Sequence, residues 1–211
     1  MVDFSFPIDG FISILDYLGT IAFAVTGASK AIAHKADIFG IIVLATVVGV
    51  GGGITRDVIF GRFPTSLSDP IYVGLTVGIA IVMFFLFTKF KKQMTVWLVF
   101  DAVGLGVFSI LGASIAYQIV GLEFLPMIFA GMITAIGGGI LRDVFVREMP
   151  IVFVKEVYAV ASIIGIAIFY GLLYFDMNVQ ISSVIGIVSV TGIRLLAMKY
   201  NWNLPKVRES N

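Results

Sequence analysis

Long apolar runs separated by short polar segments dominate the sequence. Seven of these runs reach the length of about 20 residues that a helix needs to cross the hydrocarbon core of a membrane. They are roughly Phe11–Ala33, Ile38–Phe60, Ile71–Thr88, Val96–Val120, Leu125–Val146, Val152–Tyr174 and Ile181–Met198. The pattern predicts an all-α membrane protein with seven transmembrane helices.

The composition indicates a chain that lies almost entirely in the membrane. Hydrophobic residues make up 59% and charged residues only 13%, against about 25% charged residues in a soluble domain. The mean hydropathy is +1.07. We therefore expect residues 1–211 to form a single transmembrane domain. Asp3 and Asp9 stand where a signal peptide would be basic, so the first apolar run is expected to remain in the protein.

The sequence offers little of what an enzyme or a metalloprotein needs. It has no cysteine and a single histidine, His34, which excludes disulfides, thiolate ligands and a site with two histidines from one chain. It shows neither a Ser–His pairing nor a clustered pair of acids. We therefore expect no catalytic activity, no cofactor and no metal site. The net charge of +1 gives no indication of nucleic-acid binding.

One unusual motif occurs twice. Gly51-Gly52-Gly53-Ile54-Thr55-Arg56-Asp57-Val58 returns 86 residues later as Gly137-Gly138-Gly139-Ile140-Leu141-Arg142-Asp143-Val144. Further matching pairs at an offset of 85 or 86 are Asp16 and Asp101, Phe23 and Phe108, Pro64 and Pro150, and Tyr72 and Tyr158. The matches define an internal duplication, with one copy at about residues 11–88 and the other at about residues 96–174. Since each copy has three spans, an odd number, we predict an inverted 3+3 repeat followed by a seventh helix at about 181–198.

The basic residues predict the orientation of the chain. If the N-terminus lies outside, all of the 14 Lys and Arg residues except Arg56 and Arg62 fall on the cytoplasmic side. Cytoplasmic loops of membrane proteins carry such an excess of Lys and Arg. We therefore expect a multi-pass protein of the cell inner membrane with its N-terminus outside and its C-terminus in the cytoplasm.

The two glycine triplets, Gly51–Gly53 and Gly137–Gly139, are the first candidates for a functional site. Each glycine disfavours a helix by about 1 kcal/mol relative to alanine. Three in a row can unwind or kink a helix that lines a pathway, or they can let another helix approach closely. Unwound backbone inside a membrane survives only where protein or a wet cavity surrounds it. Because the feature is duplicated, we favour kinked helices that line a pore.

Charged residues within or beside the spans are the other candidates. Neighbours in a helix do not face each other, so the sequence predicts that Arg56 and Arg142 pair with residues other than Asp57 and Asp143, or reach the membrane surface. These pairs tie helices together or flank the two mouths of a pathway. Asp16 and Asp101, near the starts of their spans, either attract cations or stabilise a helix N-terminus.

Three further charged residues receive different interpretations. Lys155 and Glu156 have no charged counterpart at the same place in the first repeat, and a lysine within a membrane segment is a functional candidate. We interpret Lys155 as a movable gate, with an anchor at the membrane surface as the alternative. Lys30 is interpreted as an anchor at a span end, and His34 is given no role.

These features resemble those of a known family. The duplicated Gly-Gly-Gly-x-x-Arg-Asp motif, the 3+3 repeat with a seventh span and Lys155-Glu156-Val157 are similar to the prokaryotic branch of the trimeric intracellular cation (TRIC) channels. That branch has also been grouped with proposed glycine transporters. The resemblance implies a homotrimer with a potassium-permeable pore inside each protomer and glycine-kinked second and fifth helices. In animal members the Lys-Glu-Val segment takes part in gating and in lipid contact.

The sequence thus supports two functions. The first is a passive channel for potassium or other monovalent cations, with membrane lipids as further partners. The alternative is a secondary transporter of a small solute such as glycine, because inverted repeats are equally typical of transporters.

Overall fold

Every secondary-structure element in the part of the chain that the structure describes is a helix. The structure is a computed structural model that describes residues 10–90, 94–154 and 157–202. Its helices are α1 Gly10–Ala33, α2 Ile38–Ile59, α3 Thr65–Ser68, α4 Pro70–Phe90, α5 Met94–Val120, α6 Phe124–Phe145, α7 Ile151–Val154, α8 Val157–Tyr174 and α9 Val179–Tyr200. The prediction of an all-helical membrane protein is confirmed.

Six helices are long and apolar enough to cross a membrane: α1, α2, α5, α6, α8 and α9. Helix α4 overlaps the third predicted span, and Pro70–Leu86, the part of it whose side chains the structure describes, is apolar. The short helices α3 and α7 were not predicted. The sixth predicted span begins within α7, whereas α8 starts only at Val157. The total of seven spans therefore stays a prediction.

Local signals in the sequence explain where α2 and α6 begin and end. Asp37 precedes α2, and its side chain accepts a hydrogen bond of 2.7 Å from the Gly40 N–H. Both glycine-rich helices are followed by a left-handed residue, Gly61 with φ +67° and Arg147 with φ +60°. Glycine adopts this conformation without steric cost, while arginine does not. The two helices thus end in the same way with different residues.

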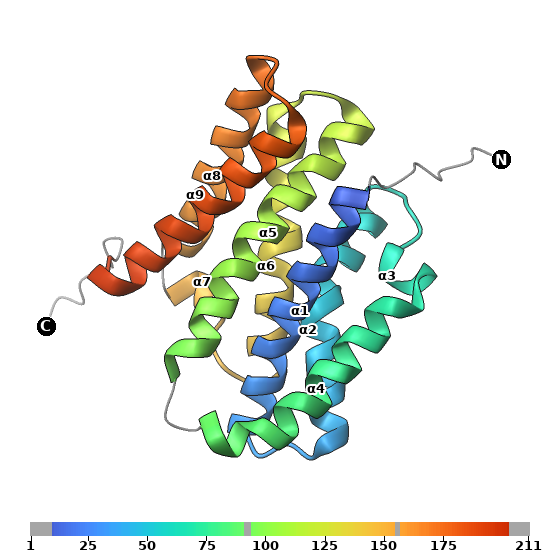
Figure 1. The fold of residues 1–211 in the computed structure, drawn as a ribbon, viewed down its shortest axis with the longest axis vertical. Helices are drawn as coiled ribbons and strands as arrows, with labels where there is room; N and C mark the ends of the chain where they lie inside the picture. Colours follow the sequence, from blue (N-terminus) through green and yellow to red (C-terminus); the bar gives the residue numbers. More distant parts are fainter. Residues whose placement is uncertain (1–9, 91–93, 155–156, 203–211) are drawn as a thin grey trace, which may run out of the picture.

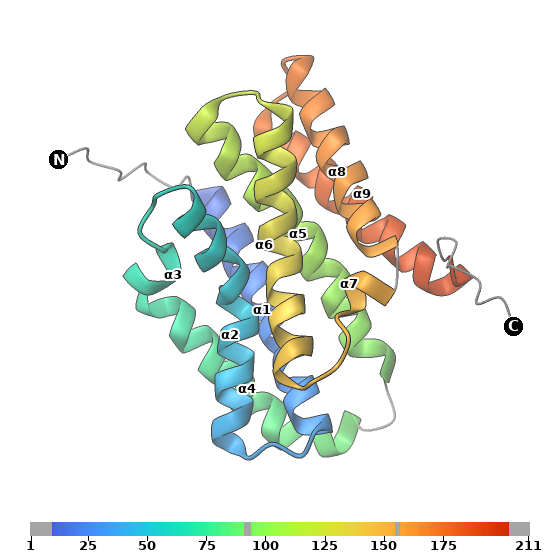
Figure 2. The same ribbon diagram turned by 180° about the vertical axis from the view of Figure 1, so that it is seen from behind.

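The helices form a central group of four with additional helices on its flanks. Helices α1, α2, α5 and α6 pack against one another, α1 against α5 and α2 against α6. Figure 1 shows α1 beside α5, and the reverse view in Figure 2 brings α2 and α6 to the front. Helix α4 packs on α1 and α2, whereas α8 packs on α6 and α9 lies against α5 and α8. The chemistry-bearing residues of both sequence repeats lie in this central group.

The outer surface is apolar, as a lipid environment requires. Large hydrophobic side chains are exposed on helices of both halves, among them Phe39, Phe85, Phe129 and Val188. A soluble monomer rarely exposes so much apolar surface. Polar and charged side chains are instead buried among α1, α2, α5 and α6, including both arginines of the repeated motif. The functional residues must therefore be sought inside the helix bundle.

Candidate functional site

Arg142 lies at the centre of a buried group of charges near the end of α6. Its Nε donates to Asp143 Oδ1 at 2.9 Å, and its NH1 group donates to Asp101 Oδ1 on α5 at 2.7 Å. All three side chains are only 1% exposed. The bond to Asp101 ties α5 to α6, as one interpretation of the sequence expected. The prediction that Arg142 does not pair with Asp143 is wrong, because the long arginine side chain folds back onto its neighbour. We call Arg142, Asp143, Asp101 and Tyr158 the Arg142 cluster.

A related group surrounds Arg56 near the end of α2. Its Nε donates to Asp57 Oδ1 at 2.9 Å, so here too the expected separation of the two neighbours is wrong. Asp16 on α1, the counterpart of Asp101, interacts with Tyr72 and lies close to Arg56. The NH1 group of Arg56, however, has no hydrogen-bond partner among the described residues. We call Arg56, Asp57, Asp16 and Tyr72 the Arg56 cluster.

The Arg56 cluster encloses a cavity of about 10 Å³, enough for about one water molecule. The hydroxyl groups of Thr20 and Ser66 line this cavity, and neither has a partner within the described ranges. The corresponding space in the second repeat is bridged by the Arg142–Asp101 pair. The Arg56 cluster thus leaves an arginine N–H group unpaired, whereas the unpaired atoms of the Arg142 cluster are Asp101 Oδ2 and the Tyr158 hydroxyl among the described residues.

Asp16 and Asp101 do not stabilise the start of a helix. Neither α1 nor α5 carries an acidic residue in its first turn, and both aspartates are buried deeper along the helices. That alternative from the sequence is wrong. A role in attracting cations stays a prediction.

The aspartates of the repeated motif hold the segments that follow the glycine-rich helices. Asp57 Oδ2 accepts a hydrogen bond of 3.0 Å from the Thr65 N–H at the start of α3. Asp143 Oδ2 accepts the equivalent bond of 2.9 Å from the Ile151 N–H at the start of α7. Each carboxylate thus bonds both to its arginine and to the next helix, and Asp143 Oδ2 also accepts from the Arg142 NH2 group at 3.3 Å. The proline that follows each motif stands directly before this short helix.

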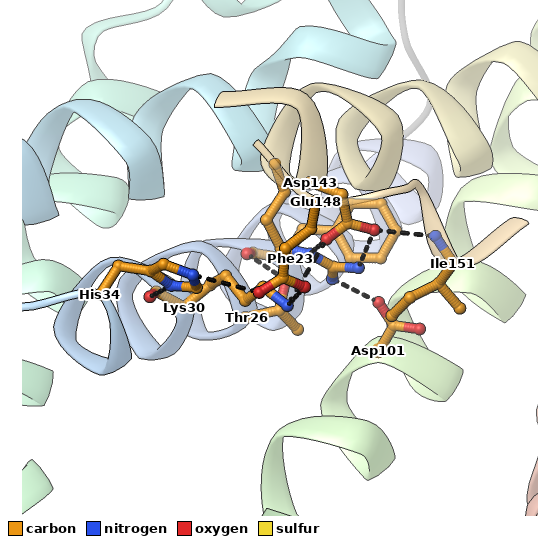
Figure 3. A network of polar contacts seen from close by, with 9 residues as sticks. Phe23, Thr26, Lys30, His34, Asp101, Asp143, Glu148 and Ile151 are labelled. Atoms are coloured by element: carbon orange, nitrogen blue, oxygen red, sulfur yellow. Dashed lines mark hydrogen bonds and ion pairs between the residues drawn. The ribbon is translucent and has the colours of Figure 1, made fainter. Parts of the chain in front are cut away.

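The Arg142 cluster continues toward the end of α1 through residues outside the repeated motif. Lys30 Nζ lies 2.6 Å from Glu148 Oε2 and 4.0 Å from Asp143 Oδ1. His34 Nε2 lies 3.1 Å from Glu148 Oε1. Figure 3 shows this chain of contacts running from His34 through Glu148 and Lys30 toward Asp143 and Asp101. Lys30 has an acidic partner near the end of α1, so its interpretation as a surface anchor stays a prediction, and His34 has a partner that was not expected from the sequence.

The ring of His34 faces oxygen atoms on both sides. Its Nδ1 lies 2.9 Å from the Lys30 carbonyl oxygen, and its Nε2 faces the Glu148 carboxylate. A neutral imidazole carries only one N–H donor, whereas the imidazolium carries two. Both contacts are therefore hydrogen bonds only when His34 is protonated.

Two residues from other helices complete this end of the bundle. The Trp97 ring on α5 lies 5.8 Å from Lys30 Nζ and 5.7 Å from the Arg142 guanidinium carbon. Arg194 on α9 is buried, with its guanidinium 4.8 Å from the Tyr158 ring. These distances fit cation–π contacts. Sequence reasoning missed Arg194 because α9 lies outside the repeat and offers no matching position.

The glycine triplets mark the place where α2 and α6 touch. Both helices continue through Gly51–Gly53 and Gly137–Gly139, so neither triplet is unwound, while the predicted kinking of these helices stays a prediction. A Cβ atom on Gly52 would meet the Thr134 carbonyl oxygen, and one on Gly138 would lie 2.5 Å from the Val48 carbonyl oxygen. Close packing, the alternative interpretation, is what the structure shows. A role in lining a pore stays a prediction.

Helices α1 and α5 also pack closely at glycines, but here an aromatic ring from each helix lies on a glycine of the other. The Phe23 ring packs on Gly104, and the Phe108 ring packs on Gly19. The two rings meet edge to face with their centroids 5.1 Å apart. Phe108 also lines the cavity of the Arg56 cluster. The ring pair thus closes the space on one side of the Arg56 cluster.

Two predicted site residues, Lys155 and Glu156, lie outside the described residues. Among the residues that are described, no group of three or more His, Asp or Glu side chains is arranged to hold a metal ion.

Comparison with known proteins finds relatives and structures that cover most of the chain. A family model described as "Glycine transporter" matches residues 13–88 and 98–174. The UPF0126 inner membrane protein YadS of Escherichia coli K12 is 36% identical over 201 residues, which is 90% of this chain and 93% of that protein.

Solved structures agree with this match. A structure that addresses conductance through TRIC cation channels has a TM-score of 0.86 at 30% identity and covers 94% of this chain and 98% of its own. A structure of the TRIC trimeric intracellular cation channel orthologue from Rhodobacter sphaeroides also has a TM-score of 0.86, at 33% identity, and covers 90% and 98%.

Proposed function

The chain belongs to the prokaryotic branch of the TRIC family, and we propose that it is a channel for potassium and other monovalent cations. The observation that carries the proposal is the likeness to solved TRIC channels over nearly the whole chain. The homologues are channel or membrane proteins rather than enzymes, which supports a role without catalysis. On this proposal the partners are the permeating cations and the surrounding lipids.

The proposed pore runs inside each protomer, between the Arg56 cluster and the Arg142 cluster. Both clusters are buried among α1, α2, α5 and α6. We infer that this conformation is closed, because the rings of Phe23 and Phe108 meet edge to face and α2 touches α6 at Gly52 and Gly138. Polar groups inside a membrane bundle are costly unless they have a function or a partner. Unpartnered polar atoms occur at both ends of the described bundle, on Thr20, Ser66 and Arg56 and on Asp101, Tyr158 and Arg194, and they support a wet pathway.

The membrane arrangement that we propose is the one predicted from the sequence. We propose seven spans in the cell inner membrane, arranged as an inverted 3+3 repeat followed by α9. The N-terminus then lies outside and the C-terminus in the cytoplasm. The segments matched by the family model, residues 13–88 and 98–174, coincide closely with the two predicted repeats. Reporter fusions after α4 and after α5 must then lie on opposite sides of the membrane. Reporters on one side would contradict the inverted repeat.

The protein is further proposed to be a homotrimer, because the Rhodobacter sphaeroides channel is described as trimeric. Chemical cross-linking in native membranes is expected to produce dimer and trimer bands. A chain that remains monomeric under these conditions would contradict the proposal.

The ion pair of Lys30 with Glu148 is proposed to hold the cytoplasmic end closed, since it links α1 to the loop after α6. Lys30→Gln is expected to raise the open-to-closed ratio in single-channel recordings by up to about fivefold, because such partly exposed pairs contribute about 0.2–1 kcal/mol. Lys35→Gln, which removes a charge from the neighbouring loop, is the control. Glu148→Gln is expected to raise the ratio in the same way, and the double variant Lys30→Gln with Glu148→Gln to raise it little further, because either change breaks the same ion pair. Equal effects of Lys30→Gln and Lys35→Gln would mean that only the local charge matters.

Lys155 is proposed as a second element of the gate, with Glu156 beside it. An ammonium group about 4 Å from a permeating cation repels it by roughly 4 kcal/mol at an effective dielectric constant of about 20. Lys155→Ala is therefore expected to raise cation conductance or open probability, and Lys155→Glu to raise it further. Lys199→Ala at the end of α9 serves as the control. Changes in expression with unaltered single-channel behaviour would identify Lys155 as a structural anchor.

Glycine transport is the second candidate, and the description of the matching family model favours it. Purified protein in a planar bilayer with a potassium gradient separates the two functions. A channel is expected to give unitary currents whose reversal potential follows the potassium gradient, with no saturable uptake of radiolabelled glycine into proteoliposomes. Saturable glycine uptake without unitary currents would reverse the assignment.

A further inference from the structure

A second pocket lies away from the proposed pore, where α1 and α9 begin and α5 ends. Its volume is about 300 Å³, at the lower end of the range for small-molecule sites. It is lined by Phe11, Ile12, Ser114, Tyr117, Gln118, Asn178, Val179, Gln180 and Ser183. None of these residues belongs to either arginine cluster, so the pocket has no part in the function proposed above.

Ser114 gives the first indication that the pocket receives a ligand. Its side chain is 2% exposed, and its hydroxyl has no hydrogen-bond partner among the described residues. Its counterpart in the first repeat, Ser29, donates to the Val25 carbonyl oxygen at 2.7 Å, which is the usual contact for a serine within a helix. A buried hydroxyl without a partner is unfavourable. In this conformation the hydroxyl oxygen is covered, and a rotation about χ1, which breaks no hydrogen bond within the described residues, would let it bond to a molecule in the pocket.

The start of α9 adds further donors to the same pocket. Asn178 accepts hydrogen bonds from the Gln180 and Ile181 N–H groups through its side-chain oxygen, at 2.8 and 3.3 Å. Its amide NH₂ group is thus left as a donor. The N-terminus of a helix also attracts negative charge. Together with Ser114, these groups suit an acceptor such as a phosphate oxygen.

Charge at this end of the molecule selects against a net anion. The pocket lining contains no charged side chain. The loops between α5 and α6 and between α8 and α9 carry Glu123 and Asp176, and the segment between α2 and α3 at this end carries Arg62, so acidic residues outnumber the basic one. Figure 1 shows both loops at the same end of the bundle. A headgroup that combines a phosphate with an amine suits this surrounding better than a purely anionic one.

The depth of the pocket matches the headgroup region of a lipid leaflet. Ser114 lies six residues before the end of α5, about 9 Å along the helix, and Ser183 lies about 6 Å inside α9. Helices α1 and α9 also expose apolar side chains beyond the pocket, namely Ile14, Leu18, Ile181, Val184 and Val188. Acyl chains can lie against these residues while the headgroup enters the pocket.

We propose that this pocket binds the headgroup of a zwitterionic aminophospholipid from the adjacent leaflet. The phosphate accepts hydrogen bonds from Ser114 and from the start of α9. The ammonium group faces the acidic loops. The site thereby links α1, α5 and α9 through a bound lipid.

Lipid binding to the purified full-length chain tests the proposal, by native mass spectrometry after delipidation in detergent. Phosphatidylethanolamine is expected to bind several-fold more tightly than phosphatidylglycerol with the same acyl chains. Ser114→Ala is expected to weaken phosphatidylethanolamine binding about two- to tenfold, the loss of one hydrogen bond. The thermal stability of the lipid-free variant should not fall, because the hydroxyl has no protein partner to lose. Ser29→Ala is the matched control and should leave the lipid affinity unchanged.

Several results would overturn the proposal. Equal affinity for both lipids, or unchanged phosphatidylethanolamine binding in both Ser114→Ala and the pocket-filling variant Ser183→Leu, would exclude the site. Equally tight binding of soluble glycerophosphoethanolamine would indicate a solute site instead. Lipid binding only after deletion of residues 1–9 would mean that the chain itself fills the pocket. A change of oligomeric state in Ser183→Leu would indicate that a second copy covers it.

Discussion

Replacing Arg142 with methionine is expected to destabilise the protein by about 3–5 kcal/mol, the usual cost of removing one partner from a buried ion pair. The Asp101 and Asp143 carboxylates, each 1% exposed, would lose the guanidinium that compensates them. Thermal or denaturant unfolding in a fixed detergent measures the loss. The additional change Asp101→Asn is expected to restore part of the stability, because it removes one uncompensated charge.

The chain contains its own control for this prediction. Arg56→Met removes the equivalent residue of the first repeat, but Arg56 bonds only to Asp57 among the described residues, and its NH1 group is unpartnered. The loss of stability is therefore expected to be smaller than for Arg142→Met. Equal losses would show that Asp16 compensates Arg56 as strongly as Asp101 compensates Arg142.

Replacing Gly52 with alanine is expected to separate α2 from α6 and to cost about 1–3 kcal/mol or more, the range for overpacking. The added methyl group would collide with the Thr134 carbonyl oxygen and approach Gly138 N to 3.4 Å. Backbone atoms cannot turn aside as a flexible side chain can. Gly138→Ala, which meets the Val48 carbonyl oxygen, is expected to behave in the same way.

The adjacent glycine provides a control with the same chemical change. A Cβ atom on Gly53 would have only the Arg56 NH2 group within 4 Å, at 3.8 Å. Gly53→Ala is therefore expected to be neutral or to stabilise the helix by up to about 1 kcal/mol. Unfolding of both variants in the same detergent gives the comparison. Similar losses for Gly52→Ala and Gly53→Ala would show that flexibility of the triplet, rather than close contact, is what the protein needs.

The two ends of the proposed pore differ in how their charged and polar groups are paired. In the Arg142 cluster the arginine bridges both aspartates, while Asp101 Oδ2 and the Tyr158 hydroxyl have no partner among the described residues, and the contacts continue through Lys30 and Glu148 to the end of α1. The Arg56 cluster has unpartnered groups around a cavity. Because Arg142 bonds to two aspartates and Arg56 to one, substitutions that break contacts at the Arg142 end are expected to change the open probability more than equivalent substitutions at the Arg56 end.

The amino-acid sequence by itself determined the class of fold and the residues of the two clusters. An apolar run in lipid must satisfy its backbone hydrogen bonds internally, so helix formation follows from composition and length. The repeated motif identified Arg56, Asp57, Arg142 and Asp143, because a costly buried charge that occurs twice at one spacing is unlikely to arise by chance. Asp16 and Asp101 were found from the same duplication.

Only the tertiary structure decided how these residues interact. Arg142 reaches both Asp143 and Asp101 because α5 lies beside α6, which no sequence spacing specifies. The glycine triplets stay helical because they let α2 and α6 approach each other closely. The packing of the two helices then stabilises both. The same residues would have been expected to break an isolated helix.

The limit of what the sequence shows is clearest for four residues whose contacts were not predicted, namely Lys30, His34, Glu148 and Arg194. The repeat positions that match Lys30 and Glu148 are Ile115 and Arg62, and α9 has no counterpart, so the duplication offered no signal for any of the four. Their roles depend on which helix ends and loops meet in space. Long polar side chains take the partner that the packing of the helices places within reach, and that packing is a property of the whole fold.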